Sequence, residues 1–308
     1  MKIFKFGGAS VKDAESVKNI TRILQQEGTE NTLVVISAMG KMTNAFEEAI
    51  DAYYNKSEEL ADKLVFIEDF HKTIIQDLFD NEDEIHKEIE ILLGELNWFL
   101  ERNTSKRYNY VYDQIICFGE LLSTKVVSAY LSKIGLENNW FDVRNFIKTD
   151  SNYRDAKVDW ELTQEIISNT LDATKLNITQ GFIAANDTEN TTTLGREGSD
   201  YTAGIFAYCL NADSVTIWKD VPGVLNADPR VFTKTTLLEQ ISYEEAIEMA
   251  FYGASVIHPK TIQPLERKEI PLFVRSFVNT KEPGTRVSKG ARLVPFIPCF
   301  IVKKNQIL

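Results

Sequence analysis

The chain is poor in cysteine, with only Cys117, Cys209 and Cys299 among its 308 residues. These three cysteines lie far apart, and none has the spacing of a metal site or a redox pair. The sequence therefore argues against a disulfide framework and fits a reducing compartment. It also lacks a signal peptide and an apolar run of membrane-spanning length, so we expect a soluble, cytoplasmic protein without a membrane partner.

Basic residues are also scarce, because 34 lysines and arginines stand against 45 aspartates and glutamates, a formal net charge of −11. This balance argues against a general nucleic-acid-binding surface. An anionic ligand would have to be held by a local cluster of cations and backbone amides. The Walker A pattern G-x-x-x-x-G-K-[ST] is absent, so a P-loop does not supply that cluster.

Residues 45–108 contain no proline and a single glycine, Gly94. Their apolar side chains, such as Leu60 and Leu64, recur at helical spacing, and acidic residues fill the positions between them. We predict several helices that form an acidic insertion. A further helix is expected from Gly119 to Leu131.

Outside this insertion, apolar runs alternate with amphipathic segments. The expected strands cover residues 3–8, 33–40, 140–143, 176–185, 214–218, 271–275 and 293–302, and the expected helices include residues 13–24, 160–171, 201–210 and a helix opened by a capping box at 242–245. This order predicts an α/β fold, a three-layer αβα sandwich with a largely parallel central sheet and a helical insertion.

The segment 191–204 is a turn rich in glycine and hydroxyl groups between a strand and a helix. Gly195 and Gly198 would let a ligand approach the backbone, and Ser199 or Asp200 is a natural N-cap. Arg196 adds a planar fork for a carboxylate or a phosphate. The segment therefore predicts an anion-binding turn, with an ordinary polar loop as the alternative.

Other strand ends carry groups that could share a ligand with this turn. Lys5, followed by Gly7 and Gly8, could place an ammonium group and backbone amides around a phosphate, although a tight turn after an edge strand is the alternative. The second strand leads to Thr43, at an edge where open α/β sheets bind ligands. Glu120 could accept hydrogen bonds from an amine, or be a first-turn acid favoured by the helix dipole.

A charged loop follows the strand that ends at Trp218. It carries Lys219, Asp220, Asp228 and Arg230, which suit the phosphates and sugar of a nucleotide. A charged surface loop is the alternative. No cluster with metal-ligand spacing occurs, so no protein metal site is expected.

Seven motifs in one order resemble the aspartokinases of the amino acid kinase superfamily over roughly residues 1–290. They are Lys5-Phe6-Gly7-Gly8, Ser37-Ala38-Met39-Gly40 with Thr43-Asn44, Phe118-Gly119-Glu120, Thr179-Gln180-Gly181-Phe182, Thr192-Thr193-Leu194-Gly195-Arg196 with Gly198-Ser199-Asp200-Tyr201-Thr202-Ala203, Trp218-Lys219-Asp220-Val221-Pro222-Gly223-Val224 with Asp228-Pro229-Arg230, and Tyr252-Gly253-Ala254 with Ile257-His258-Pro259. One such motif alone is weak evidence, but seven in register are specific.

The resemblance implies ATP-dependent phosphorylation of the side-chain carboxylate of L-aspartate, with Mg²⁺ on the phosphates, as the first step of lysine, threonine and methionine synthesis. Residues 1–185 would form the amino-acid-binding lobe and residues 186–290 the nucleotide-binding lobe.

The resemblance also implies roles for the residues that match its motifs. Arg196 would bind the α-carboxylate of aspartate and Glu120 its amine, with Thr43 and Ser199 adding hydrogen bonds. Lys5, Gly7 and Gly8 would hold the transferring phosphoryl group, and Asp200 would orient Lys5 through an ion pair. The nucleotide would lie on Lys219, Asp220, Asp228 and Arg230.

The chain departs from the family pattern at several positions. Ala9 stands where threonine is usual, Glu197 where glycine is usual, Ser255 where lysine is usual, and Lys219 where a small hydroxyl residue is common. Lys219 could compensate for the cation that Ser255 lacks. Family members usually continue into ACT domains, whereas residues 291–308 form only a tail, so we expect insensitivity to lysine and threonine.

Two other functions stay open. The chain could be another amino acid kinase, acting on glutamate, acetylglutamate, carbamate or UMP, although the pair of Arg196 and Glu120 favours a free α-amino acid. It could also be a catalytically weak subunit that binds a ligand or a partner. The apolar tail at residues 293–302 would be exposed if unpaired, which suggests a homodimer.

Overall fold

The computed structural model describes residues 1–253 and 257–302, and its centre is an eight-stranded sheet. The strand order is β3-β4-β2-β1-β7-β9-β10-β8. The strands are β1 (Lys2–Phe6), β2 (Thr32–Ile36), β3 (Asn139–Trp140), β4 (Asn177–Gln180), β7 (Ser214–Lys219), β8 (Gln240–Ile241), β9 (Leu272–Ser276) and β10 (Thr285–Val287). Neighbouring strands pair in parallel, except for the antiparallel pair of β9 and β10. The predicted α/β fold with a largely parallel sheet is confirmed.

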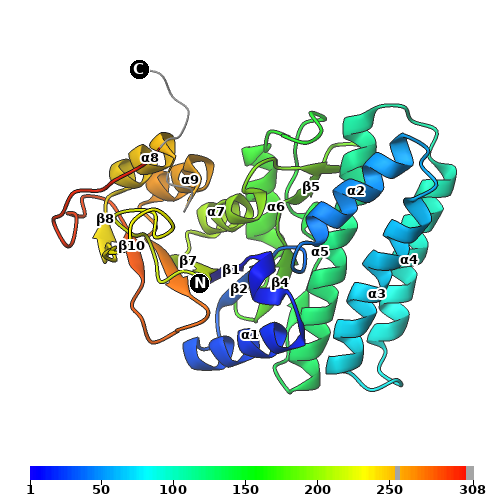
Figure 1. Ribbon diagram of the computed structural model, residues 1–308, viewed down its shortest axis with the longest axis horizontal. Helices are drawn as coiled ribbons and strands as arrows, with labels where there is room; N and C mark the ends of the chain where they lie inside the picture. The colour runs from blue at the N-terminus through cyan, green and yellow to red at the C-terminus, as the bar shows by residue number, and fades with distance from the viewer. Residues whose placement is uncertain (254–256, 303–308) are drawn as a thin grey trace.

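Helices cover both faces of this sheet (Figure 1). They include α1 (Ala14–Glu27), α5 (Tyr108–Lys133), α6 (Trp160–Thr170), α7 (Gly198–Leu210), α8 (Tyr243–Tyr252) and α9 (Pro259–Lys268). Helix α7 packs on β1, β2 and β7 with α6 and α9 beside it, while α1 lies on the opposite side of the sheet. The predicted three layers are therefore present.

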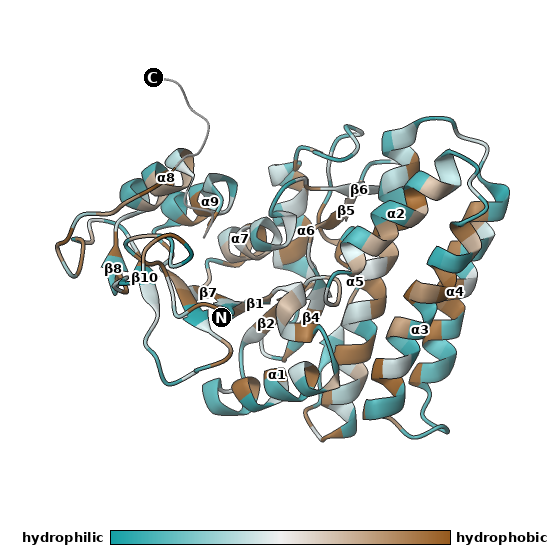
Figure 2. Cartoon of the chain, viewed as in Figure 1, coloured by the Kyte–Doolittle hydropathy of each residue, from teal (hydrophilic) through white to brown (hydrophobic). Residues whose placement is uncertain are grey.

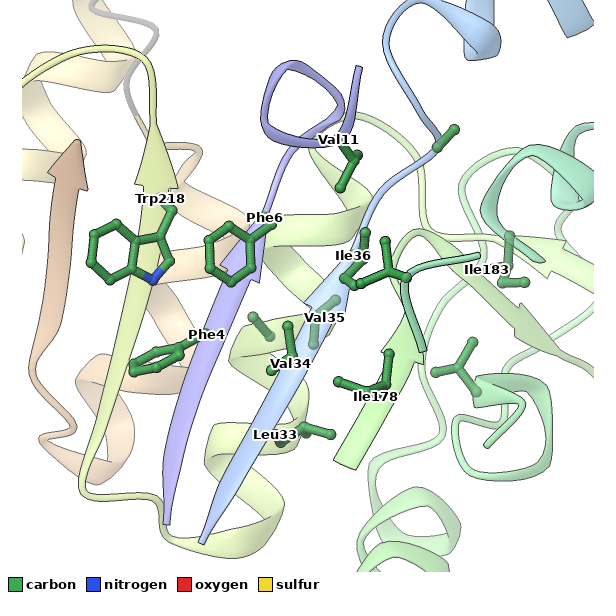
Figure 3. Close-up of a cluster of buried hydrophobic side chains, with 14 of the residues drawn as sticks. Phe4, Phe6, Val11, Leu33, Val34, Val35, Ile36, Ile178, Ile183 and Trp218 are labelled. Atoms are coloured by element: carbon green, nitrogen blue, oxygen red, sulfur yellow. The ribbon is translucent and has the colours of Figure 1, made fainter. Parts of the chain in front are cut away.

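The two faces of β1 carry different chemistry. Phe4 and Phe6 point to one face, where Trp218 of β7 stacks on Phe6 at a centroid distance of 5.9 Å and meets Phe4 edge-on at 6.0 Å (Figure 3). Because side chains alternate along a strand, Lys5 points to the other face, toward α7. The apolar face anchors the strand and leaves its end free to present a charge.

The predicted helical insertion is confirmed as α2 (Met42–Tyr54), α3 (Leu60–Leu78) and α4 (Ile85–Arg102), and hydrophilic and hydrophobic residues alternate along α3 and α4 in Figure 2. The next helix, α5, begins at Tyr108, well before the predicted Gly119. Glu120 therefore lies in the middle of α5, and its interpretation as a first-turn acid was wrong. Within the described ranges α5 is also the one helix long and apolar enough to span a membrane, contrary to the predicted absence of such a run, and 78% of its most apolar window is buried in the protein.

The strand predicted at 176–185 is in fact two strands. Phe182 has φ 70° after Gly181, so the chain leaves the main sheet there. It continues as β5 (Ile183–Ala185), which pairs in antiparallel fashion with β6 (Thr191–Thr193). A left-handed residue that is not glycine ends the strand, and the apolar pattern does not reveal it.

The apolar tail at 293–302 does not form the predicted strand in its described part, which makes only isolated bridges at Val294 and Phe300. Phe296 is 93% exposed.

The predicted capping box is confirmed, because the Ser242 hydroxyl accepts from the Glu245 N–H and the Glu245 carboxylate accepts from the Ser242 N–H.

One buried histidine gives the fold a testable acid sensitivity. His71 of α3 is fully buried, and its Nδ1 lies 2.7 Å from the Ile67 carbonyl oxygen. Burial lowers the pKa of the His71 imidazole to about 4 from an ordinary value of 6.5. The unfolded chain therefore binds a proton at a pH where the folded chain does not, and stability falls as the pH drops from about 6.5 toward 4.

We predict that His71→Leu removes this contribution. Between pH 7 and pH 5 the wild-type free energy of unfolding should fall by about 2 kcal/mol more than that of the variant. Urea unfolding at the two pH values measures the difference. His86→Leu, at a less buried position on α4, is the matched control. Equal slopes for wild type and His71→Leu would contradict the prediction.

Candidate active site

A buried ion pair lies at the carboxyl end of β1. Lys5 Nζ is 2.6 Å from Asp200 Oδ1, and the two side chains are 11% and 1% exposed. Asp200 comes from the first turn of α7, which packs on β1. The predicted ion pair between these residues is therefore present, and burial makes it far stronger than a surface pair because little water screens it.

A second ammonium group approaches the same carboxylate. Lys219 is the last residue of β7, beside β1 in the sheet, and its Nζ lies 3.7 Å from Asp200 Oδ2. Burial disfavours ionisation of Asp200, but the charges of Lys5 and Lys219 outweigh it and hold the pKa of Asp200 below its ordinary value. Asp200 is thus ionised and shared by two cations.

The glycine pair after β1 packs closely against the loop that follows β2. A Cβ added at Gly8 would lie 2.6 Å from the Gly40 carbonyl oxygen and 2.8 Å from that of Ala38, and the Gly40 N–H donates to the Gly8 carbonyl. At Gly7 an added Cβ would lie 3.3 Å from Lys5 Nζ. Gly8 therefore permits close packing of backbone, whereas Gly7 leaves space beside the ammonium group of Lys5.

Glu120 is a buried carboxyl group beside this turn. Its Oε2 atom has no hydrogen-bond partner in the part of the chain that the structure describes. Burial raises the pKa of Glu120 to about 8, although the Ala38 N–H and the charge of Lys5 oppose the shift. A buried carboxyl group with an unpartnered oxygen is well suited to receive an ammonium group from a ligand.

The remaining predicted ligand-binding residues surround the start of α7. Ser199 is buried against Gly181, where an added Cβ would come within 2.4 Å of the serine Cβ. Arg196 is exposed, and no described residue forms a hydrogen bond or an ion pair with it. Thr43 is half-buried in the first turn of α2, which follows β2.

The predicted N-cap of this turn was wrong, and its two glycines pack closely against other protein atoms. Helix α7 begins at Gly198, so Ser199 and Asp200 lie inside its first turn, and the N-cap is Glu197, whose side chain makes no capping hydrogen bond. An added Cβ at Gly195 would meet Asp155 Oδ1, and one at Gly198 would meet the Phe182 ring, each at 2.6 Å. These glycines therefore make room for protein atoms, and their predicted approach to a ligand stays a prediction.

The loop after β7 is organised differently from the buried cluster. Asp220 is exposed, and Arg230 pairs with Asp228 at 2.8 Å while its own side chain is 85% exposed. This arrangement agrees with a charged surface loop, which was the alternative to a nucleotide-binding loop. The nucleotide roles of these three residues stay predictions. Ser255 and Ala254 lie outside the described residues.

Sequence reasoning missed the residues that support the site. Asp113 is fully buried on α5 and accepts hydrogen bonds from the Thr193 N–H and hydroxyl and from the Arg154 N–H, which ties β6 to the helix. Burial raises the pKa of Asp113 to about 6, and these hydrogen bonds oppose the shift. An acid within an apolar helix was a visible signal. The influence of the Ala38 N–H on the pKa of Glu120 had no such signal, because backbone donors leave no mark in a sequence.

A hollow of about 510 Å³ lies elsewhere, between the end of α4 and the start of α5. Its walls include Trp98, Arg102 and Tyr153, and none of the predicted site residues lines it. The candidate site therefore depends on the buried charges at the strand ends and not on this hollow.

Comparison with known proteins shows which sequences this chain is similar to. The amino acid kinase family matches residues 1–276. The chain is 34% identical to lysine-sensitive aspartokinase 3 of Escherichia coli (strain K12), over 99% of this chain and 68% of that protein. It is 33% identical to the chloroplastic bifunctional aspartokinase/homoserine dehydrogenase 2 of Arabidopsis thaliana, over 92% of this chain, but it spans only 32% of that protein's length.

A solved structure agrees with these sequences. E. coli aspartokinase III in complex with aspartate and ADP matches with a TM-score of 0.85 and 34% identity, over 94% of this chain and 64% of that one.

We predict that alanine substitutions at the two glycines after β1 differ in their effect on stability. Gly8→Ala forces a Cβ against two backbone carbonyls and should lower the free energy of unfolding by about 1–3 kcal/mol. Gly7→Ala meets only the end of a lysine side chain, at φ −81°, so it should be neutral or slightly stabilising. Urea unfolding compares the two, with Gly94→Ala in open space on α4 as a control. Equal stability of the Gly8 and Gly7 variants would refute the assignment of Gly8 to packing.

Proposed function

Because the chain belongs to the amino acid kinase family, and to the aspartokinases within it, we propose that it transfers the γ-phosphoryl group of ATP to the side-chain carboxylate of L-aspartate. The product would be 4-phospho-L-aspartate, at the start of lysine, threonine and methionine synthesis. One observation carries this proposal: a buried Lys5–Asp200 pair lies at the end of β1, close enough to the unpartnered Glu120 carboxyl for the charge of Lys5 to act on it.

The chemistry of the acceptor fits the residues that are present. The side chain of aspartate has an ordinary pKa near 3.9, so it is already an anionic nucleophile at neutral pH and requires no general base. Phosphoryl transfer then depends on in-line positioning and on cations around the equatorial oxygens. Buried ammonium groups held in place by a carboxylate perform both tasks without reorganisation.

On the phosphoryl side, Lys5 and the amides of Gly7 and Gly8 would bind the transferring group. Asp200 fixes the position of the Lys5 ammonium group, because Lys5 Nζ lies 2.6 Å from Asp200 Oδ1. Lys219 would bring a second cation to the same phosphates.

On the amino acid side, Glu120 would bind the α-ammonium group of aspartate with its unpartnered oxygen. The approach of that cation would lower the pKa of Glu120 and complete its ionisation. The exposed fork of Arg196 would bind the α-carboxylate, and the hydroxyls of Ser199 and Thr43 would contribute hydrogen bonds. The presence of aspartate and ADP in E. coli aspartokinase III supports this pair of ligands.

The nucleotide would extend from the phosphates along the loop after β7, past Asp220 to Asp228 and Arg230. Within the described ranges no group of three histidine, cysteine or acidic residues is arranged to hold a metal ion. We therefore propose that Mg²⁺ binds mainly through the phosphate oxygens and brings positive charge to them.

We also propose a cytoplasmic location and a homodimer that covers exposed apolar residues such as Phe296. Analytical sedimentation would test the homodimer.

A coupled assay for ADP release tests the reaction itself. With MgATP, aspartate should be turned over much faster than glutamate, acetylglutamate, carbamate or UMP, because only a free α-amino acid uses both Glu120 and Arg196. Faster turnover of another substrate would assign the chain to a different kinase. No turnover of any substrate would indicate a subunit that only binds a ligand or a partner.

We predict that Lys5→Ala lowers kcat by about 10²- to 10³-fold, because it removes a preorganised cation from the transferring phosphoryl group. Lys2→Ala is the matched control on the same strand, since the Lys2 ammonium group donates to the Glu27 carbonyl away from the site. Circular dichroism should show that both variants are folded. Near-wild-type turnover by folded Lys5→Ala would exclude the role.

A further inference from the structure

The start of α9 fixes a lysine beside the turn that carries Arg196. His258 is the N-cap of α9, and its Nδ1 accepts the Lys260 N–H at 3.2 Å, while Pro259 occupies the first helical position. Proline suits that position because its fixed φ is already helical. Lys260 is thus held in the first turn of α9, which packs against α7 (Figure 1). The proposed function does not use the motif of His258 and Pro259, and here the motif determines where Lys260 lies.

The ammonium group of Lys260 joins two acceptors from distant parts of the chain. Its Nζ lies 2.8 Å from Asp155 Oδ1 and 2.8 Å from the Leu194 carbonyl oxygen. It also lies 5.0 Å from the centre of the Tyr201 ring of α7. The side chains of Lys260 and Asp155 are 29% and 73% exposed, so the ion pair alone contributes little to stability. The hydrogen bond to a backbone carbonyl distinguishes Lys260 from an ordinary surface lysine.

The Leu194 carbonyl lies just before the turn that presents Arg196. Strand β6 ends one residue earlier, and within the described ranges no backbone N–H donates to this carbonyl oxygen. A tight turn follows, closed by the Gly198 N–H, which donates to the Gly195 carbonyl at 3.1 Å. Arg196 lies inside that turn, and its exposed side chain has no hydrogen bond or ion pair with a described residue. The backbone of the turn therefore determines where the guanidinium group lies.

The carboxylate partner of Lys260 lies against the same turn. An added Cβ at Gly195, which has φ 77°, would come within 2.6 Å of Asp155 Oδ1, the oxygen that pairs with Lys260. The loop that carries Asp155 is itself tied to β6, because the Ala156 N–H donates to the Thr193 carbonyl at 2.9 Å. The turn is therefore held by a loop and by a helix that are far apart in the sequence, and Lys260 is the link between them.

We propose that Lys260 is a positioning residue that acts on the amino acid substrate through Arg196. Its ammonium group joins the Leu194 carbonyl to the Asp155 carboxylate and so holds the turn in one place. From that place the Arg196 guanidinium group binds the α-carboxylate of the substrate, which Lys260 itself does not contact. The kinetic part of this inference rests on the proposed function, whereas the effect of Lys260 on the turn does not.

Steady-state kinetics of Lys260→Met test the role in substrate binding. The KM for aspartate should rise about tenfold, because a displaced guanidinium group loses a charge-assisted hydrogen bond, while kcat and the KM for ATP should change less than about threefold. A fall in kcat with an unchanged KM for aspartate would contradict the proposal.

Lys268→Met is the matched control on the same helix. Lys268 Nζ lies 2.8 Å from Asn211 Oδ1 and 4.8 Å from the centre of the Tyr208 ring, so this variant loses the same charge and similar contacts away from the turn. Both variants should be folded by circular dichroism, and Lys268→Met should keep the wild-type KM for aspartate. An equal rise of KM in the two variants would assign the effect to the lost charge and refute the proposal.

A double-mutant cycle tests whether Lys260 acts through Arg196. The ratio kcat/KM, taken from rates at low aspartate concentration, is compared in the wild type and in Arg196→Gln. Lys260→Met should lower this ratio about tenfold in the wild type but less than about twofold in Arg196→Gln, because the second background has already lost the group that Lys260 positions. Equal losses in both backgrounds would mean that Lys260 acts independently of Arg196, against the proposal.

Amide hydrogen exchange separates a failure of this inference from a failure of the proposed function, because it needs no substrate. In Lys260→Met the amides of residues 194–198 should exchange about tenfold faster than in the wild type, and in Lys268→Met they should not. If the wild-type chain does not turn over aspartate, the proposed function fails and exchange alone decides the inference. Faster exchange in Lys260→Met then supports it, and unchanged exchange overturns it.

Discussion

The Lys5–Asp200 ion pair is the interaction on which the rest of the site depends. Two opposite charges are held at 2.6 Å with almost no exposure to water. Removing one partner from such a pair typically leaves a buried charge uncompensated and costs about 3–5 kcal/mol. The protein must therefore keep Lys5 and Asp200 together, and in doing so it fixes an ammonium group at the carboxyl end of a central strand.

The fold supports this pair from both sides of the sheet. Trp218 stacks on Phe6 and meets Phe4 edge-on, which anchors one face of β1, and strand alternation sends Lys5 to the other face, where α7 begins. The close contact of Gly8 with the loop after β2 brings the Ala38 N–H and Glu120 beside the same strand end. Parallel strands thus gather a cation, an acid and backbone amides at one edge, where open α/β sheets bind ligands.

Patterns of residue type predicted much of this architecture, but they did not predict the backbone conformations of single residues. Apolar periodicity indicated the helices of the insertion, and the family motifs indicated the pairing of Lys5 with Asp200. The left-handed Phe182 and Glu197 could not be foreseen, because neither residue type favours that conformation. Glu120 was misplaced at a helix start, because the polar residues from Tyr108 to Gln114 hid the first turns of α5. The local sequence does not show the tertiary packing that covers the first turns of α5.

The most direct test of the central claim measures how much the γ-phosphate adds to the affinity of the protein for a nucleotide. Calorimetry would compare the Mg²⁺ complexes of ADP and of a non-hydrolysable ATP analogue in the wild type and in Lys5→Met. If Lys5 holds the transferring group, the variant should lose about tenfold or more in affinity for the analogue and little for ADP. Equal losses for both nucleotides, or no loss for either, would contradict the account.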